Sequence, residues 1–272
     1  MKNKTLNLKN KIVLLGASNL TLSLRMIIHL LQQHCGGPSE VLVAAGHGRS
    51  YGQTSQVLVR ELPGIVRSGL WQRLQSGEPH PVYAFLTDIG NDIPYGFNPD
   101  QILRWVSWCI QQLRSRDARI VMTNLPLTSI ESLSELRFRM LRSLLFPSCQ
   151  LSHDEVIIRA QTVHQGLNEL AARNQLILYE PESEWMSMDS IHISFGKRHD
   201  FYRQLFKYFA NSGAFDKNQS ECTPMTVSSD TKSPFLSWQQ RPQFAVRRVF
   251  GKIKHATQPS GYLGNNTTVS LY

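Results

Sequence analysis

The sequence predicts an α/β fold: a three-layer α/β/α sandwich with helices on both faces of a five-stranded parallel sheet. Short apolar runs alternate with longer segments of helical periodicity, which is typical of parallel sheets. Polar or glycine-rich loops follow several of these runs, and ligand sites form at such loops. The 272 residues, 41% of them hydrophobic, suffice for one α/β domain of roughly 200–250 residues.

The strands are predicted from short apolar runs. The first run, Lys-Ile-Val-Leu-Leu-Gly, leads from a basic N-terminal stretch into a tight turn. The five predicted strands are residues 11–16, 40–45, 81–87, 119–124 and 176–180. Because helical segments separate them, we expect these strands to pair in parallel.

The helices are predicted from apolar residues on one helical face and from capping residues. Asn98 is a helix cap, and Pro99 occupies the first helical position. Ser152 with Glu155 forms a second start signal of the capping-box type. The predicted helices are residues 20–34, 66–75, 98–116, 130–145, 153–173 and 197–210.

The composition divides the chain into a catalytic domain over residues 1–212 and a tail over residues 213–272. The tail holds seven Lys and Arg against three Asp and Glu, within a formal net charge of +9 for the whole chain. We expect it to be a basic, low-order, solvated extension, apart from an amphipathic piece at 244–255 with apolar residues at helical spacing.

The sequence also bears on compartment and cofactors. No apolar run is long enough for a membrane span, and the apolar residues after the N-terminal lysines are too few for a signal peptide. The four cysteines lack the CxxC spacing of metal sites, which favours a reducing compartment. We therefore expect a cytoplasmic protein that needs neither metal nor cofactor.

Ser18 is the candidate nucleophile. It stands in Gly16-Ala17-Ser18-Asn19-Leu20, where the first predicted strand turns into a helix. A serine at this turn presents its hydroxyl at the sheet edge, and the N–H groups of a helix start suit a developing oxyanion. An ordinary helix cap is the alternative interpretation of this serine.

Asp189 and His192 are the candidate partners of this serine. A serine nucleophile needs a base, and histidine titrates in the required range. A carboxylate three residues before the histidine is suitably spaced to hold its ring and stabilise the imidazolium. A surface Asp–His pair is the alternative.

Two further loops offer hydrogen-bond donors to an oxyanion. Asn91, in Gly90-Asn91-Asp92 after the third predicted strand, carries an uncharged amide donor, although an ordinary turn explains the same residues. Gly52, in the loop after the second strand, offers a backbone N–H, with Gly48 as its competitor. Arg49 in that loop would favour an anionic substrate group or, alternatively, be an exposed loop arginine.

In their order and placement these segments resemble the SGNH hydrolases, also called GDSL-like esterases and lipases. The resemblance covers about residues 10–211 and implies a flavodoxin-like SGNH fold. It implies that Ser18 is the nucleophile, that Asp189 and His192 complete the triad, and that Ser18, Gly52 and Asn91 form the oxyanion hole. The chain departs from the family pattern at Ala17, where aspartate is usual, and at Ile89, where glycine is usual, so it resembles a divergent member.

The expected function is hydrolysis of an acyl ester through an acyl-enzyme, without a metal. An O-acyltransferase that uses the same triad is one alternative. The other is a non-catalytic binding protein whose basic tail is attracted to a membrane or nucleic acid. We expect a small-molecule ester as the partner, no nucleic acid, and at most weak contact of the tail with an anionic surface. The sequence leaves the oligomeric state open.

Overall fold

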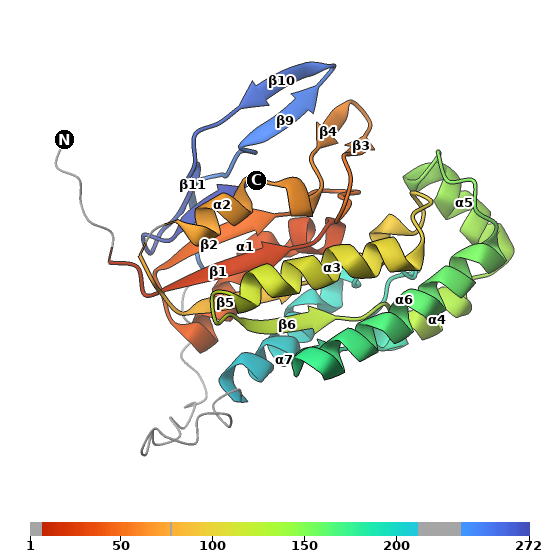
Figure 1. Ribbon diagram of the computed structural model, residues 1–272, viewed down its shortest axis with the longest axis horizontal. Helices are drawn as coiled ribbons and strands as arrows, with labels where there is room; N and C mark the ends of the chain where they lie inside the picture. The colour runs from red at the N-terminus through yellow and green to blue at the C-terminus, as the bar shows by residue number, and fades with distance from the viewer. Residues whose placement is uncertain (1–6, 77, 212–234) are drawn as a thin grey trace.

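The computed structural model describes residues 7–76, 78–211 and 235–272 and contains two sheets (Figure 1). The larger sheet has eight strands in the order β7-β6-β5-β1-β2-β12-β11-β8. Its strands are β1 (Asn10–Leu15), β2 (Ser39–Ala44), β5 (Val82–Leu86), β6 (Arg119–Thr123), β7 (Ile177–Tyr179), β8 (Trp238–Gln240), β11 (Gly261–Leu263) and β12 (Thr268–Leu271).

The five predicted strands form the parallel part of this sheet. β1 lies between β2 and β5, β6 pairs with β5, and β7 pairs with β6, all in parallel. Every residue of β1 and β2 is buried, as expected for strands with helices on both faces. The sheet is larger than predicted because β12 continues it in parallel beside β2, and β11 and β8 follow in antiparallel pairing.

Helices cover both faces of the larger sheet. Helices α2, α3 and α6 pack with the side of β1 that carries Val13 and Leu15, whereas α1 and α7 pack with the side that carries Ile12 and Leu14. The helices are α1 (Ser18–Cys35), α2 (Leu70–Gln75), α3 (Pro99–Arg114), α4 (Leu127–Glu131), α5 (Glu135–Leu145), α6 (His153–Asn174) and α7 (Arg198–Asn211).

The predicted caps are present: Asn98 and Ser152 both form capping boxes. The helix predicted at 66–75 begins later, at Leu70, after a 3₁₀ turn over Ile65–Arg67. The helix predicted at 130–145 is divided into α4 and α5. Two further 3₁₀ turns lie near candidate site residues. Ile89–Asp92 contains Asn91, and Phe195–Lys197 follows shortly after His192.

The prediction of a low-order tail was wrong for residues 235–272. Residues 212–234 lie outside the described residues, but 235–272 form five strands, three of which belong to the larger sheet. The amphipathic piece at 244–255 forms a hairpin of β9 (Val246–Val249) and β10 (Lys252–His255) rather than a helix. A two-residue turn with positive φ at Phe250 and Gly251 allows this tight reversal.

The smaller sheet is a feature that sequence patterning did not predict. It has the order β10-β9-β4-β3, in which β3 (Ser55–Val57) and β4 (Arg60–Leu62) form a second hairpin after β2. Figure 1 shows the two hairpins side by side, projecting beyond one edge of the larger sheet.

Within the described ranges, no helix is long and apolar enough to cross a membrane. Cys35, Cys109 and Cys149 are free thiols, and Cys222 falls among the residues that the structure does not describe.

Candidate active site

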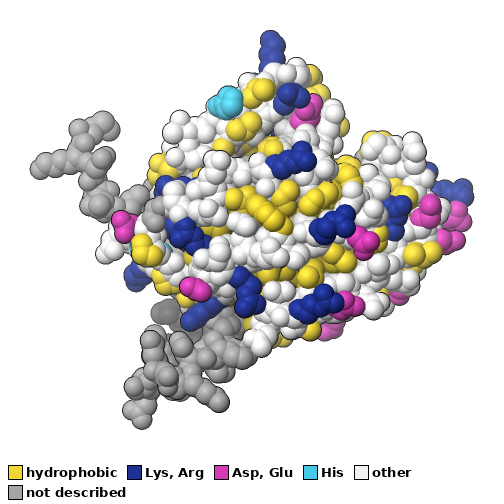
Figure 2. All heavy atoms as spheres, viewed as in Figure 1, with side chains coloured by type: hydrophobic (Ala, Val, Ile, Leu, Met, Phe, Trp, Pro, Cys, Tyr) yellow, Lys and Arg dark blue, Asp and Glu magenta, His cyan; other side chains and the backbone are white. Residues whose placement is uncertain are grey.

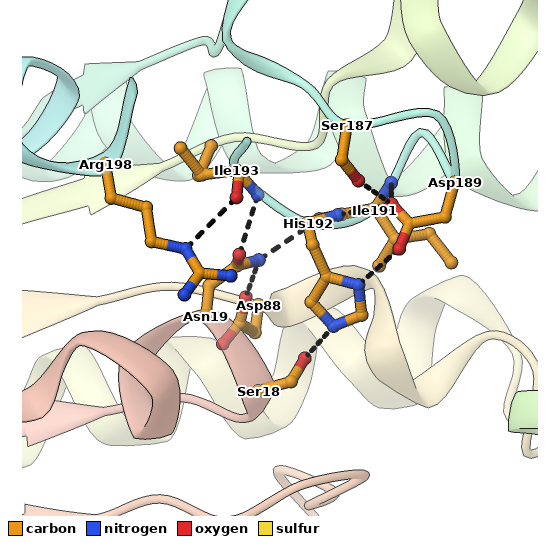
Figure 3. Close-up of polar contacts among 9 residues, drawn as sticks. All are labelled: Ser18, Asn19, Asp88, Ser187, Asp189, Ile191, His192, Ile193 and Arg198. Carbon is orange, nitrogen blue, oxygen red and sulfur yellow. Dashed lines mark hydrogen bonds and ion pairs between the residues drawn. The ribbon is translucent and has the colours of Figure 1, made fainter. Parts of the chain in front are cut away.

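Ser18, His192 and Asp189 are joined by hydrogen bonds at the carboxyl end of β1 (Figure 3). The Ser18 hydroxyl lies 2.8 Å from His192 Nε2, and His192 Nδ1 lies 2.6 Å from Asp189 Oδ2. Ser18 is the first residue of α1, while the other two residues lie in a loop more than 170 positions later along the chain. The fold therefore brings together the three residues that the sequence predicted as nucleophile, base and carboxylate.

The carboxylate is fixed by its own loop. Asp189 Oδ1 accepts hydrogen bonds from the backbone N–H of Ile191 at 3.0 Å and of His192 at 2.9 Å, and from the Ser187 hydroxyl at 2.5 Å. Burial raises the pKa of Asp189, but the hydrogen bonds from His192, Ser187 and Ile191 together outweigh it, so its pKa lies well below the usual value. Asp189 is therefore ionised throughout the neutral range.

The pKa of the His192 imidazole is shifted in the opposite direction, upward. The hydrogen bond that His192 Nδ1 donates to Asp189 raises the pKa of His192 above its usual value, and burial opposes this effect only in part. A carboxylate behind the ring stabilises the imidazolium that forms when the ring accepts a proton. The pair is thus arranged for an imidazole that takes a proton from the Ser18 hydroxyl.

Asn19 ties the serine turn to the histidine loop. Its side-chain oxygen accepts a hydrogen bond from the Ile193 N–H at 2.9 Å. Its side-chain nitrogen donates to the Ile191 carbonyl at 3.1 Å and to Asp88 Oδ1 at 2.8 Å. One amide side chain therefore holds the backbone on both sides of His192, next to Ser18 in sequence.

Asp88 completes this connection from the loop after β5. Its Oδ2 accepts the N–H of Ala17 at 2.7 Å, just before α1, where a negative charge stabilises a helix start. Asp88 has a φ of 60°, in the left-handed region that few residues other than glycine occupy. No sequence motif pointed to Asn19 or Asp88, although Asn19 directly follows Ser18 and Asp88 directly follows the third predicted strand.

Asn91 also lies at this end of the sheet. Its side-chain nitrogen donates to the Arg49 carbonyl at 3.0 Å, and its backbone N–H donates to the Asp88 carbonyl at 3.2 Å. Asn91 and Ser18 line the same cavity. Since an amide nitrogen carries two hydrogens, one hydrogen bond to Arg49 leaves Asn91 a second donor.

The geometry does not support the Gly52 assignment. The Gly52 N–H donates to the Ser50 hydroxyl at 3.1 Å, so this donor is used within its own loop. A Cβ atom at Gly52 would lie 2.0 Å from the indole of Trp105, which shows that the glycine is required for close packing. Gly48, with a φ of 65° and its carbonyl bound to the Tyr95 hydroxyl at 2.6 Å, is the remaining glycine candidate.

Arg49 is neither exposed nor available to a substrate. Its side chain is completely buried and donates to the carbonyl oxygens of Ala45 and Pro63. It also donates to the carbonyl of Tyr272, at the end of the strand β12. Arg49 therefore connects the loop after β2 to the C-terminal strands.

A cavity of about 150 Å³ opens beside Ser18. From Ser18, Asp88 and Asn91 it extends between the loop after β6 and the helices α4, α5 and α6. Its walls away from the serine are mostly apolar and include Leu125, Ile130, Leu133, Phe138, Phe146, Val156 and Ala160. In the ranges that the structure describes, no group of three or more His, Cys, Asp or Glu residues is placed to hold a metal ion.

No protein-family model matches this chain, and no curated protein matches it by sequence. Solved structures do match. A carbohydrate acetylesterase family member from Sinorhizobium meliloti, and the carbohydrate acetylesterase Est24 from the same organism, each align with a TM-score of 0.51 and 12% identity. Each alignment covers 74% of this chain and 99% of the other. An aryl esterase from M. smegmatis aligns with a TM-score of 0.49 and 15% identity over 73% of this chain and 97% of its own.

The chain has the SGNH hydrolase fold. The alignments span nearly the whole of the matched structures but about three quarters of this chain, so this chain is the longer partner.

The turn before Ser18 departs from the pattern of the family that the sequence resembles. The family resemblance places an aspartate where this chain has Ala17. Here the carboxylate bound to the backbone of that turn comes instead from Asp88, on the neighbouring strand end.

Proposed function

We propose that this protein hydrolyses carboxylic esters, with Ser18 as nucleophile, His192 as general base and Asp189 as the carboxylate that holds the imidazole. The observation that carries the proposal is the continuous hydrogen-bond chain from the Ser18 hydroxyl through both ring nitrogens to Asp189. The matched carbohydrate acetylesterases from Sinorhizobium meliloti are consistent with it.

The reaction proceeds in two steps. His192 takes the Ser18 proton while the oxygen attacks the acyl carbon, and then returns that proton to the departing alcohol. In the second step His192 takes a proton from water, which attacks the acyl-enzyme and releases the acid and free Ser18. Asp189 stays ionised throughout and stabilises the imidazolium in each step.

We propose two donors for the oxyanion. The N–H of Ser18 is at the start of α1, where helix geometry provides no intrahelical acceptor. The second donor is the remaining amide hydrogen of Asn91. We assign the oxyanion role to these two groups, with the Gly48 N–H as a third candidate and without Gly52, whose N–H is bound to Ser50.

The cavity beside Ser18 suits an apolar acyl group. An apolar cavity of about 150 Å³ in another protein accommodates benzene, so a similar volume corresponds to an acyl chain of about six carbons. Because the apolar walls begin beside the nucleophile, we assign this space to the acyl part of the ester and the solvent side to the alcohol.

The test compares Ser18→Ala and His192→Ala with the unchanged protein on nitrophenyl acetate and hexanoate. Each variant is expected to lose at least 10³-fold in kcat, and Ser18→Ala is expected to abolish labelling by a fluorophosphonate probe. Ser143→Ala and His199→Ala, both at exposed positions, are the matched controls. Unchanged turnover in both site variants would contradict the assignment.

The acyl assignment has its own test. Ala160→Leu places extra methyl groups in the cavity wall, and we expect it to reduce the preference for hexanoate over acetate about tenfold. Ala171→Leu, also buried on α6, is the control for general overpacking. An unchanged preference in Ala160→Leu, with Ser18-dependent activity retained, would reject the acyl pocket and leave the hydrolase assignment standing.

A further inference from the structure

The two adjacent hairpins of the smaller sheet expose apolar side chains at and near their tips. Leu58 is 88% exposed at the β3–β4 turn, Phe250 is 77% exposed at the β9–β10 turn, and Ile253 on β10 is 56% exposed. The Phe250 N–H donates to the Val59 carbonyl at 3.1 Å, so the two turns lie side by side. We call these residues, with Val59, the tip surface.

Both turns use residues that are unfavourable for their backbone conformation. Leu58 has a φ of 53° and Phe250 a φ of 48°, in the left-handed region where glycine and asparagine are the usual residues. Since both side chains point into solvent, burial in the fold does not compensate for this strain. Bulky apolar residues at strained, exposed positions indicate that something outside the chain's own core contacts them.

Cationic side chains lie near the tips on one face of the smaller sheet, whereas Ile253 lies on the other face. The register pairs Lys254 with Arg247, and it places Lys252 and Arg60 on either side of Val249, so these four cations share a face. Like charges directly across from each other destabilise a sheet. Glu61, the acidic residue of β4, is opposite Arg248 on the other face and forms an ion pair with it at 3.1 Å.

Figure 2 shows dark blue Lys and Arg side chains with yellow apolar side chains over the projecting part of the molecule where these hairpins lie. Charge favours an anionic partner here, because Lys254 is directly opposite Arg247 in the register and no acidic side chain of these paired positions shares their face. An anion bound on this face would reduce the repulsion between these cationic side chains.

We propose that the smaller sheet docks onto an anionic phospholipid surface, with Leu58 and Phe250 inserted among the lipid chains and the cationic face against the head groups. Apolar side chains flanked by lysine and arginine are what such an interface requires. A nucleic acid would use the cations but would leave the two strained apolar tips unexplained.

Docking in this way would place the candidate active site near the lipid. Val57, next to Leu58, packs against Gly48, and the Gly48 carbonyl binds the Tyr95 hydroxyl in the loop that follows Asn91. The inference does not depend on ester hydrolysis, because a surface contact of the smaller sheet is independent of Ser18.

The test is co-sedimentation of the full chain with vesicles of phosphatidylcholine alone and of phosphatidylcholine mixed equally with phosphatidylglycerol. We expect binding to the mixed vesicles, weakened by added salt, and little binding to the neutral ones. Leu58→Asn with Phe250→Asn is expected to weaken binding to mixed vesicles about tenfold or more. Lys252→Gln with Lys254→Gln is expected to reduce both the binding and its salt dependence.

Asparagine is well tolerated at positive φ, so the tip variant is expected to stay folded, with an unchanged or higher melting temperature. Ile158→Gln, which removes an exposed apolar side chain from α6, is the matched control and should bind like the unchanged protein. Ser18→Ala should also bind normally.

The proposal would be overturned by no sedimentation with mixed vesicles at low salt, by equal binding of the tip variant, or by equal binding to neutral vesicles. Binding to duplex DNA that depends on Lys252 and Lys254 but not on the tips, in place of vesicle binding, would also overturn it. So would tip-dependent self-association without vesicle binding, measured by analytical ultracentrifugation.

Discussion

The two sheets of this protein differ in what their strands bury. In β1 and β2 of the larger sheet every residue is buried, whereas every residue of β10 in the smaller sheet is exposed. Strands packed on both faces fix the positions of the loops at their ends, which catalysis requires. Strands that bury little leave their side chains available to contact a partner. Substitutions in the two sheets test this difference: those near the larger sheet should affect turnover most, and those in the smaller sheet should affect it least.

The largest effect is expected at Asp189. Asp189→Asn keeps the shape of the side chain but removes the charge that stabilises the His192 imidazolium, so kcat should fall about 10⁴-fold. Asp200→Asn, an exposed carboxylate on α7, is the control. A loss below tenfold, measured with a short nitrophenyl ester, would show that the pair is only a surface contact.

The next effect concerns Asp88. Asp88→Asn removes the charge at the start of α1 and disturbs the hydrogen bond from Asn19, so the serine turn and the histidine loop should shift relative to each other. A displacement of this kind costs up to about 10²-fold in kcat. If Asp88 served stability alone, kcat of the folded variant would be unchanged and only the melting temperature would fall.

The pH profile should reflect His192. Hydrolysis needs the neutral imidazole, and the pKa of His192 is raised by Asp189, so kcat/KM should decrease as pH falls through a value above 6.5. The decrease is about tenfold per pH unit below that pKa. In Asp189→Asn the main cause of the raised pKa is absent, and the acidic limb should move to lower pH. A limb that stays in place would indicate that another group controls the profile.

Gly52, which precedes the smaller sheet, should matter for packing. Gly52→Ala forces a Cβ against Trp105 and should lower the free energy of unfolding by about 1–3 kcal/mol. Gly196→Ala has open space around it and is the matched control. Thermal unfolding measures both. A Gly52→Ala protein as stable as the unchanged protein would contradict this packing role.

The smallest effect is expected at the hairpin tip. Phe250→Asn relieves an unfavourable backbone conformation at an exposed position, so the free energy of unfolding should rise by about 0.5–1 kcal/mol. Asn266→Leu, at a φ of 63°, makes the opposite change and should lower it. Destabilisation by Phe250→Asn in denaturant titrations would mean that the phenyl ring supports the fold.

Much of the larger sheet could be predicted because its signals are local. The apolar runs of the five parallel strands and the capping boxes at Asn98 and Ser152 each occupy a few consecutive residues. Ser18, Asp189 and His192 could be predicted because a strand end, a helix start and a three-residue spacing are also local features.

The smaller sheet and the C-terminal strands could not be predicted in the same way. Strands such as β3 and β4 have three residues each and mixed polarity. Three residues are too few for an alternating apolar pattern to be recognised. β12 is a strand because it pairs with β2, a partner more than two hundred residues earlier. The same limit hid Asp88 and Asn19, which make contacts between three loops. The Gly52 N–H is different, because its hydrogen bond to Ser50 lies within one turn, and it is the turn geometry that the sequence did not reveal.

The contact of Arg49 with the Tyr272 carbonyl has a consequence for biosynthesis. The two residues are separated by 223 positions, so the ribosome must add that length of chain before the buried guanidinium meets this acceptor. Contacts between such distant segments form slowly. The loop beside the serine turn therefore completes its contacts only after β12 has been synthesised and has joined the sheet.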